Sequence, residues 1–306
     1  MSFEQQEKVL LDLLFDHSIR ENFRNDIEAT LAKYDLNENE INDFKTIRPD
    51  ALEIDANMRT NLFIAHICRS FPVTFSIVSS FNNGIELLKK LVDAELMHTP
   101  PIERTTVYGT RLREQLVTLK FNNPNEQRII NAILEAELGM AWTAATLKQV
   151  VLEKGLADDI QQGDKSNWSS RPIKLASYVS AAMLPQPYTK LKQKLCPKTK
   201  CDLWTEISKT PVNADKRSKV LQQEDPRLLI ARAQVNHLSQ CEPSIDHQTI
   251  ELSEGFAHLF QHVNGTASID QILAAFSQAG APAPLLQSVK TGFKELFDKG
   301  MLVCTD

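Results

Sequence analysis

The chain has 306 residues, of which 42% are hydrophobic and 24% are charged, and its formal net charge is −5. This length accommodates two domains with their own cores, and the composition is that of an ordinary globular protein. No stretch approaches the roughly 20 apolar residues of a membrane-spanning helix, and the N-terminus lacks a basic region followed by an apolar one. We therefore expect a cytoplasmic protein.

The five cysteines, an odd number spread from Cys68 to Cys304, do not resemble a secreted disulfide framework and are expected to be reduced. Cys196 and Cys201 form the only close pair, with no second pair and no histidine nearby. We interpret this pair as part of a lysine-rich loop, the alternative being a wide metal knuckle.

The first 50 residues carry apolar side chains at helical spacing. The pattern predicts one helix from Val9 to Phe23, a second over 26–34 and a third from about Asn37 to Phe44. The stretch 11–52 is similar to small helical modules seen beside modification enzymes. A plain helical bundle explains the same pattern equally well.

Residues 53–80 continue as helix, with a bend predicted at Phe71-Pro72 because proline removes a backbone hydrogen bond. The order of Arg59, Asn61, Phe71-Pro72 and the run 87–92 resembles the N-terminal helical domain of the HvfC and BufC group, which accompanies iron enzymes. That group usually has Tyr-Arg-Asn-Asn where this chain has Met58-Arg59-Thr60-Asn61, so the resemblance implies a fold and no residue's role.

Further helices are predicted over 108–120 and from Pro124 to about 156, followed by polar turns over 164–172 and a short apolar segment over 175–184. Residues 188–219 contain nine Lys and Arg against three acidic residues, a charge of +6. This composition predicts a solvated basic linker over 188–224, with a nucleic-acid contact as the alternative.

The last part of the chain, 225–306, changes pattern. Strands are predicted over 228–238, 241–246 and 249–252, and three helices follow, the second capped by Ser268. The third helix spans 283–299, and residues 300–303 form a closing strand. This order predicts a winged helix, so that the chain is mainly α with a C-terminal α+β domain, divided into 1–187, 188–224 and 225–306.

The charge of this region argues against DNA binding. It holds five Lys and Arg against nine Asp and Glu, a formal charge of −4, whereas a DNA-binding winged helix needs a positive face to displace counterions from phosphate. The run from Phe256 to Leu273, with Val263-Asn264-Gly265-Thr266 at its centre, resembles the PqqD-like recognition element of ribosomal peptide modification systems. The resemblance implies that the domain binds a leader peptide.

We expect such a leader to add as a strand beside 249–252, because an open strand edge can pair with an extended peptide. Leu286, Val289 and Phe293 would form the floor of a groove, and Lys290 and Lys294 would meet acidic leader residues at its rim. Helical spacing alone cannot distinguish such a floor from a core. The predicted peptide-binding residues are Thr249, Ile250, Glu251, Leu286, Val289, Lys290, Phe293 and Lys294.

Other constellations are weaker. Glu254, His258 and His262 recur every four residues on one predicted helix and could form one edge of a metal site, but the order of the HExxH motif is absent. The sequence has no GxSxG, P-loop or glycine-rich dinucleotide turn. We therefore expect no catalytic residue, metal or cofactor in this chain.

Taken together, these segments resemble the TglI/MbnC-like partner subunits of multinuclear non-haem iron enzymes. The resemblance implies a heterodimer in which the enzyme holds the iron and oxidises a peptide cysteine, as in 3-thiaglutamate-type biosynthesis, while this chain recruits the leader. A winged-helix transcription regulator and a stand-alone enzyme with an unrecognised site remain as alternatives. Neither the precursor peptide nor the oxidation product can be named from the sequence.

Overall fold

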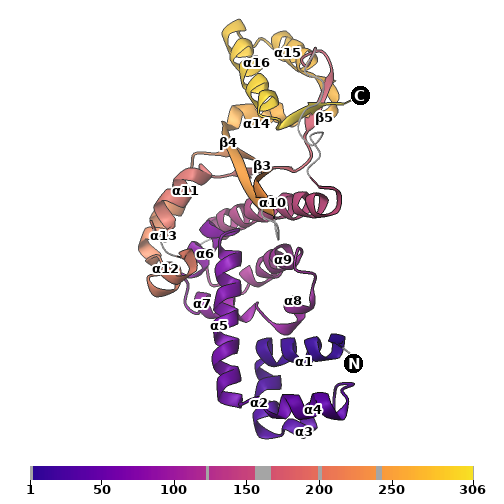
Figure 1. Cartoon of the computed structure of the whole chain (residues 1–306). Coiled ribbons are helices and arrows are strands. Elements are labelled where there is room, and N and C mark those ends of the chain that lie inside the picture. The colour runs from indigo at the N-terminus through magenta and orange to yellow at the C-terminus, as the bar shows by residue number, and fades with distance from the viewer. Residues whose placement is uncertain (1–2, 122–123, 156–166, 199–201, 239–242, 306) are drawn as a thin grey trace. The chain divides into compact units, whose positions relative to one another are not determined.

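The computed structural model describes residues 3–121, 124–155, 167–198, 202–238 and 243–305. These residues are mainly helical, with small antiparallel sheets built largely from the C-terminal half of the chain (Figure 1). This confirms the predicted mixture of a mainly α chain and a C-terminal α+β region. No helix in the described ranges is long and apolar enough to cross a membrane.

The chain forms two compact units, and each is assembled from two separate stretches of sequence. Unit 1 comprises residues 1–122 and 193–219, and unit 2 comprises residues 123–192 and 220–306. These ranges differ from the predicted division at 187 and 224. The predicted linker is divided between the two units and is largely helical, because its lysines alternate with apolar side chains that are buried, namely Leu191, Leu195, Trp204 and Ile207.

Unit 1 is helical. Its helices are α1 (Phe3–Phe15), α2 (His17–Asn25), α3 (Ile27–Leu31), α4 (Glu38–Lys45), α5 (Pro49–Cys68), α6 (Pro72–Val78), α7 (Gly84–Lys90), α8 (Ala94–His98), α9 (Arg104–Leu116), α12 (Leu203–Lys209) and most of α13 (Ala214–Leu221). A first core lies among the helices from α1 through α5 and includes Leu13 and Phe23, both fully buried. Phe71, Phe75 and Tyr108 form a second aromatic core, in which the Tyr108 hydroxyl donates to the Leu88 carbonyl at 2.9 Å.

Capping residues set the helix boundaries in this unit. The single helix predicted over 9–23 is two helices, because the Asp16 carboxylate accepts from the backbone N–H of Ile19 and starts α2. Asn37 and Glu40 form a reciprocal capping box at the start of α4. The predicted bend at Phe71-Pro72 is confirmed, since α5 ends at Cys68 and α6 begins at Pro72.

Unit 2 contains one long helix, six strands and three short C-terminal helices among its described residues. Its elements are α10 (Pro124–Lys154), β1 (Pro172–Leu175), β2 (Val179–Leu184), the first residues of α11 (Tyr188–Leu195), β3 (Arg227–Leu238), β4 (Pro243–Ser253), α14 (Glu254–Phe260), β5 (Asn264–Ser268), α15 (Ile269–Gln278), α16 (Ala283–Asp298) and β6 (Leu302–Cys304). The strands form two antiparallel sheets of order β2-β3-β4 and β5-β1-β6.

Several strands differ from the sequence prediction. The strands predicted over 241–246 and 249–252 are one continuous strand, β4, although Cys241 itself lies outside the described residues. The apolar segment 175–184 supplies β2, which pairs with β3, and residues 264–265, predicted to end a helix, begin β5. Ser268 caps α15 as predicted, and the closing strand β6 is confirmed, paired with β1.

Gly84, the first residue of α7, gives a test of this fold. A Cβ atom added there would lie 1.8 Å from the Val78 carbonyl oxygen, so backbone would have to move. We expect Gly84→Ala to lower the free energy of unfolding by about 1–3 kcal/mol, as overpacking does elsewhere, measured by urea denaturation followed by circular dichroism.

Gly255 in α14 is the matched control, because an added Cβ atom meets nothing within 4 Å. Gly255→Ala should leave stability unchanged or raise it by up to about 1 kcal/mol, since alanine favours helix. Equal effects of the two substitutions would contradict the described approach of α7 to α6.

Candidate functional site

Strand β4 lies at one edge of the sheet β2-β3-β4 and contains three of the predicted peptide-binding residues, Thr249, Ile250 and Glu251. It pairs with β3 from Arg227↔Ser253 to Leu238↔Pro243, with a shift in register between Val235 and His237, and Thr249, Ile250 and Glu251 lie opposite Ala231, Ile230 and Leu229. Among the described residues, no strand pairs with the other edge of β4. An edge of this kind exposes backbone donors and acceptors that an extended peptide can pair with.

The two faces of β4 contact different helices. Ile250 and Leu252 are partly buried against a core formed by β1, β3, β6 and the helices α14, α15 and α16. On the opposite face, His247 lies on α10, with its Nε2 atom 2.9 Å from the Met140 carbonyl oxygen. The Glu251 carboxylate accepts from both the backbone N–H and the hydroxyl of Thr189, each at 2.7 Å, near the start of α11. β4 is therefore fixed on both faces while its edge lacks a strand partner in the described ranges.

The prediction that Val289 and Phe293 on α16 form the exposed floor of a groove is wrong. Phe293 is fully buried, with its ring 4.8 Å from that of Phe256, and Val289 is buried in the same core. Both side chains pack the C-terminal helices together and do not face solvent. Leu286 is partly buried, and its neighbour Leu285 is 53% exposed, so only the first turns of α16 offer apolar surface to a ligand.

The two predicted rim lysines lie on α16 with acidic partners already in place. The ammonium of Lys290 is 3.0 Å from the Asp270 carboxylate on α15, and that of Lys294 is 2.6 Å from Asp298 one turn further along α16. All four side chains are partly exposed. An acidic ligand would compete with these carboxylates, so each lysine contributes less than an unpaired cation would.

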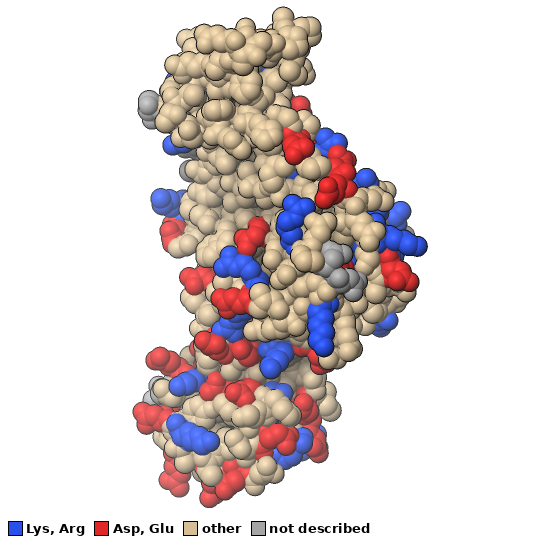
Figure 2. Space-filling view, turned by 180° about the vertical axis from the view of Figure 1, so that it is seen from behind, with Lys and Arg blue, Asp and Glu red and all other residues tan. Residues whose placement is uncertain are grey.

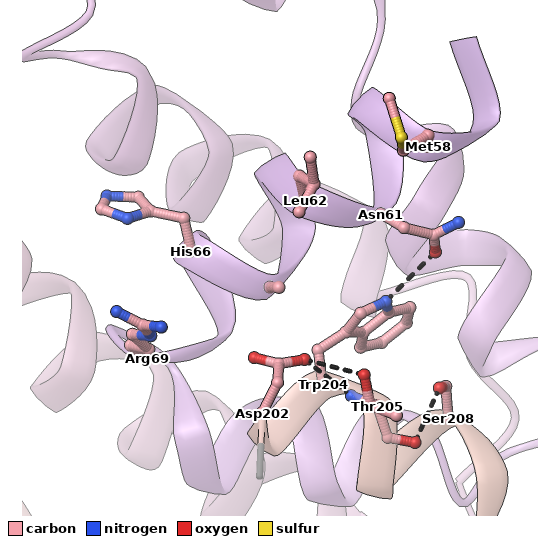
Figure 3. A pocket seen from close by; sticks show the side chains of 10 residues that line it. Met58, Asn61, Leu62, His66, Arg69, Asp202, Trp204, Thr205 and Ser208 are labelled. Atoms are coloured by element: carbon pink, nitrogen blue, oxygen red, sulfur yellow. Dashed lines mark hydrogen bonds between the residues drawn. The ribbon is translucent and has the colours of Figure 1, made fainter. Parts of the chain in front are cut away.

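A second candidate site is an open pocket of about 700 Å³ in unit 1, between α5 and α12 (Figure 3). Trp204 is almost fully buried at its base and donates from Nε1 to the Asn61 side chain at 3.3 Å. Asp202 caps α12 by accepting from the backbone N–H and the hydroxyl of Thr205. The remaining lining residues are Met58, Leu62, Ala65, His66, Arg69 and Ser208.

The lining of this pocket combines polar and apolar side chains. The hydroxyls of Thr205 and Ser208 already donate to the Asp202 carboxylate and the Thr205 carbonyl. One part of the rim is apolar, since Met58 and Leu62 are 54% and 64% exposed, whereas Asn61, His66 and Arg69 are exposed polar residues of the lining. In the sequence, Met58 and Asn61 carry only a family resemblance. The pattern that could have indicated this pocket is the four-residue spacing of the apolar side chains Met58 and Leu62 along α5.

Two further groups of residues were considered as metal ligands from the sequence, the histidines near α14 and the pair Cys196 and Cys201. His258 and His262 lie exposed on or just after α14, and the His262 ring contacts Phe276 edge-on. No group of three or more His, Cys, Asp or Glu side chains arranged to hold a metal occurs within the described ranges. The Cys196 thiol donates to the Pro72 carbonyl at 3.4 Å, whereas Cys201 lies outside those ranges.

The chain was compared with protein-family models, with curated proteins and with solved structures, and none of the three comparisons found a match.

The burial of His247 predicts a pH dependence of stability. Desolvation lowers the pKa of its imidazole below the usual 6.5, against smaller opposite effects of the Met140 carbonyl and Asp246. A lowered pKa means that the folded state binds a proton less readily than the unfolded chain. The free energy of unfolding should therefore fall as the pH falls from about 6.5 to the lowered folded-state pKa.

We expect His247→Gln to reduce this loss, measured as the difference in the free energy of unfolding between about pH 8 and about pH 5. Glutamine keeps a donor for the Met140 carbonyl but does not titrate. An unchanged difference would show that other groups produce the acid sensitivity.

Proposed function

We propose that this chain is a non-catalytic subunit that binds the leader of a ribosomally made precursor peptide and presents it to a separate multinuclear non-haem iron enzyme. The observation that supports the proposal most directly is β4, an edge strand followed by the helices α14, α15 and α16, with the short strand β5 between the first two. The sheet β2-β3-β4 and the helices after β4 resemble the strands and helices of the winged-helix, PqqD-like recognition element, with the differences that α11 to α13 separate β2 from β3 in the chain and that β5 separates α14 from α15. The specific winged-helix assignment is part of this proposal.

The leader would pair with the edge of β4 as a fourth strand. Backbone hydrogen bonds supply affinity in this mode, and alternate side chains supply specificity. The apolar side chains of the leader would pack against Ile250, Leu252 and Leu286, which are partly buried. Val289 and Phe293 are buried and do not take this role. The proposed site is thus the strand edge with the first turns of α16.

Charge supports a peptide over DNA as the ligand. On the face seen in Figure 2, the C-terminal end of the molecule is mostly uncharged and shows no cluster of Lys or Arg. Both lysines of α16 are paired, Lys290 with Asp270 and Lys294 with Asp298. A phosphate backbone requires unpaired cations along a contiguous surface.

The partner in this proposal is the iron enzyme, which holds the metal and oxidises a cysteine of the peptide, in a lasting heterodimer with this chain. We expect the chain purified alone to contain far less than one iron per molecule, because its described residues hold no cluster of metal ligands. Inductively coupled plasma mass spectrometry measures this directly. Stoichiometric iron in the lone chain would favour the stand-alone enzyme instead.

Leader binding is tested with a synthetic peptide that has the leader sequence of a precursor encoded beside this chain. We expect the peptide to slow backbone amide exchange in residues 247–252, because strand addition protects N–H groups at the edge of β4. Hydrogen exchange read by mass spectrometry locates the protection. Binding without protection in β4 would place the peptide elsewhere.

Charge reversal refines the test. Lys290→Glu or Lys294→Glu should weaken binding of an acidic leader roughly threefold to tenfold and reduce its salt dependence, because each places a new carboxylate beside Asp270 or Asp298. Lys299→Glu is the matched control, since it breaks a similar 2.6 Å ion pair with Glu295 at the far end of α16. Equal effects at all three positions would exclude a role for the rim.

A further inference from the structure

The charged side chains of the edge strand β4 are all acidic. From Pro243 to Ser253 the sequence contains Asp246 and Glu251 and no Lys or Arg. The one histidine of the strand, His247, lies on α10, and burial lowers the pKa of its imidazole, so it is neutral at pH 7. The strand at the open edge of the sheet is therefore anionic.

The chain that follows β3 supplies no positive charge to balance this strand. From position 233 to position 289 the sequence contains five Asp and Glu residues and no Lys or Arg. Within the described ranges, neither Asp246 nor Glu251 forms an ion pair with a Lys or Arg side chain. Both carboxylates therefore keep their charge for a ligand.

The two arginines of the neighbouring strand β3 are engaged elsewhere. Arg227 forms an ion pair with Asp225 at 2.8 Å. Arg232 donates to the Lys299 carbonyl at the end of α16, at 2.7 Å. Neither guanidinium neutralises the carboxylates of β4.

Each of the two carboxylates is held in place through one oxygen atom. The Oε1 atom of Glu251 accepts from the backbone N–H and the hydroxyl of Thr189, and the Oδ2 atom of Asp246 accepts from the Asn236 amide at 2.6 Å. In the part of the chain that the structure describes, the second oxygen of each carboxylate accepts no hydrogen bond. A carboxylate fixed in this way can bind a cation with little further loss of side-chain freedom.

A strand added to β4 would place its side chains directly opposite those of β4. Opposed residues have Cβ atoms about 4.5–5.5 Å apart, so Lys or Arg opposite Asp246 or Glu251 would be stabilising and Asp or Glu would be destabilising. Ile250 and Leu252 flank Glu251 and pack against the core of the C-terminal helices, so residues opposite them meet apolar surface. Asp246 and Glu251 are five positions apart, and their partners would have the same spacing.

We propose that the leader segment that pairs with β4 is cationic, with Lys or Arg opposite Asp246 and Glu251 and apolar side chains opposite Ile250 and Leu252. This inference rests on the proposed function and names the chemistry of the segment that the edge selects. The lysines of α16 do not oppose it, because each already has a carboxylate partner. Charge complementarity of this kind suppresses binding of wrong partners.

Two synthetic peptides test the charge on the full chain. Val-Lys-Val-Thr-Ser-Thr-Lys has the proposed pattern for antiparallel pairing, and Val-Glu-Val-Thr-Ser-Thr-Glu differs from it only in charge. Each peptide is also made in reverse order, which tests parallel pairing. At low ionic strength the lysine peptide should bind about fivefold more tightly or better, and high salt should reduce this preference. NMR titration measures both dissociation constants, and hydrogen exchange should show protection of β4 by the lysine peptide.

A third peptide, Val-Thr-Val-Lys-Lys-Ser-Thr, has the composition of the lysine peptide but places the lysines opposite Gln248 and Thr249. It controls for a general attraction between a cationic peptide and an acidic protein. It should bind about threefold or more weakly than the peptide with the proposed pattern, because opposed side chains interact most strongly.

Amide substitutions in the chain locate the charge. Glu251→Gln and Asp246→Asn keep an oxygen acceptor for Thr189 and Asn236 and remove only the charge. Each should weaken binding of the lysine peptide about twofold to fivefold. Asp35→Asn, which removes an exposed carboxylate from unit 1, is the matched control and should leave binding unchanged. Circular dichroism verifies that the three variants are folded.

The outcomes separate this inference from the proposed function. Protection of β4 by the lysine and glutamate peptides with equal affinity would overturn the inference and leave the strand edge as the site. Tighter binding of the glutamate peptide, equal binding of the third peptide, or equal effects of Asp35→Asn and Glu251→Gln would overturn it as well. Protection of β4 by none of the peptides would overturn the strand edge as the site, and this inference with it.

Discussion

Unit 2 depends on β3, the strand that is covered on both faces and paired on both edges. Leu228 and Ile230 face the core beneath α14–α16, and Ala233 faces α10. β2 and β4 hydrogen-bond to its two sides. Burial of this strand fixes the register of β4, and with it the position of every side chain at the open edge, because a slip of one residue would turn Ile250 and Leu252 to the opposite face.

Local signals in the sequence predicted the helices better than the sheets. Ser268, Asn37 and the Phe71-Pro72 bend all act within a few residues, and the structure places each as expected. The sequence pattern does not indicate β2, because its partners in β3 lie 43 to 53 residues later, from Leu184↔Arg227 to Val179↔Arg232, and no local pattern records such a contact. The composition of the basic segment 188–219 predicts a solvated linker because lysines are frequent in it. The structure differs because a few apolar side chains, such as Leu191 and Trp204, are buried.

The residues of the candidate site are also predicted only in part from local sequence patterns. The edge strand around Thr249 could be predicted from strand propensity and its place before three helices. Val289 and Phe293 could not be assigned to core or groove, because helical spacing places both on one face and says nothing of what covers that face.

Each unit is built from two stretches that alternate along the chain, and this order constrains how the chain folds during synthesis. The first 122 residues leave the ribosome without Trp204 and Ile207, which lie in the later stretch of unit 1. Until that stretch emerges, Phe75 lacks the indole of Trp204, which packs edge-on against it with 6.0 Å between the ring centroids. Unit 2 likewise waits for residues 220–306, so neither unit is complete until most of the protein has been translated. A cut at any single point would therefore leave at least one of the two cores unfinished, so the two units cannot both be recovered from separate fragments.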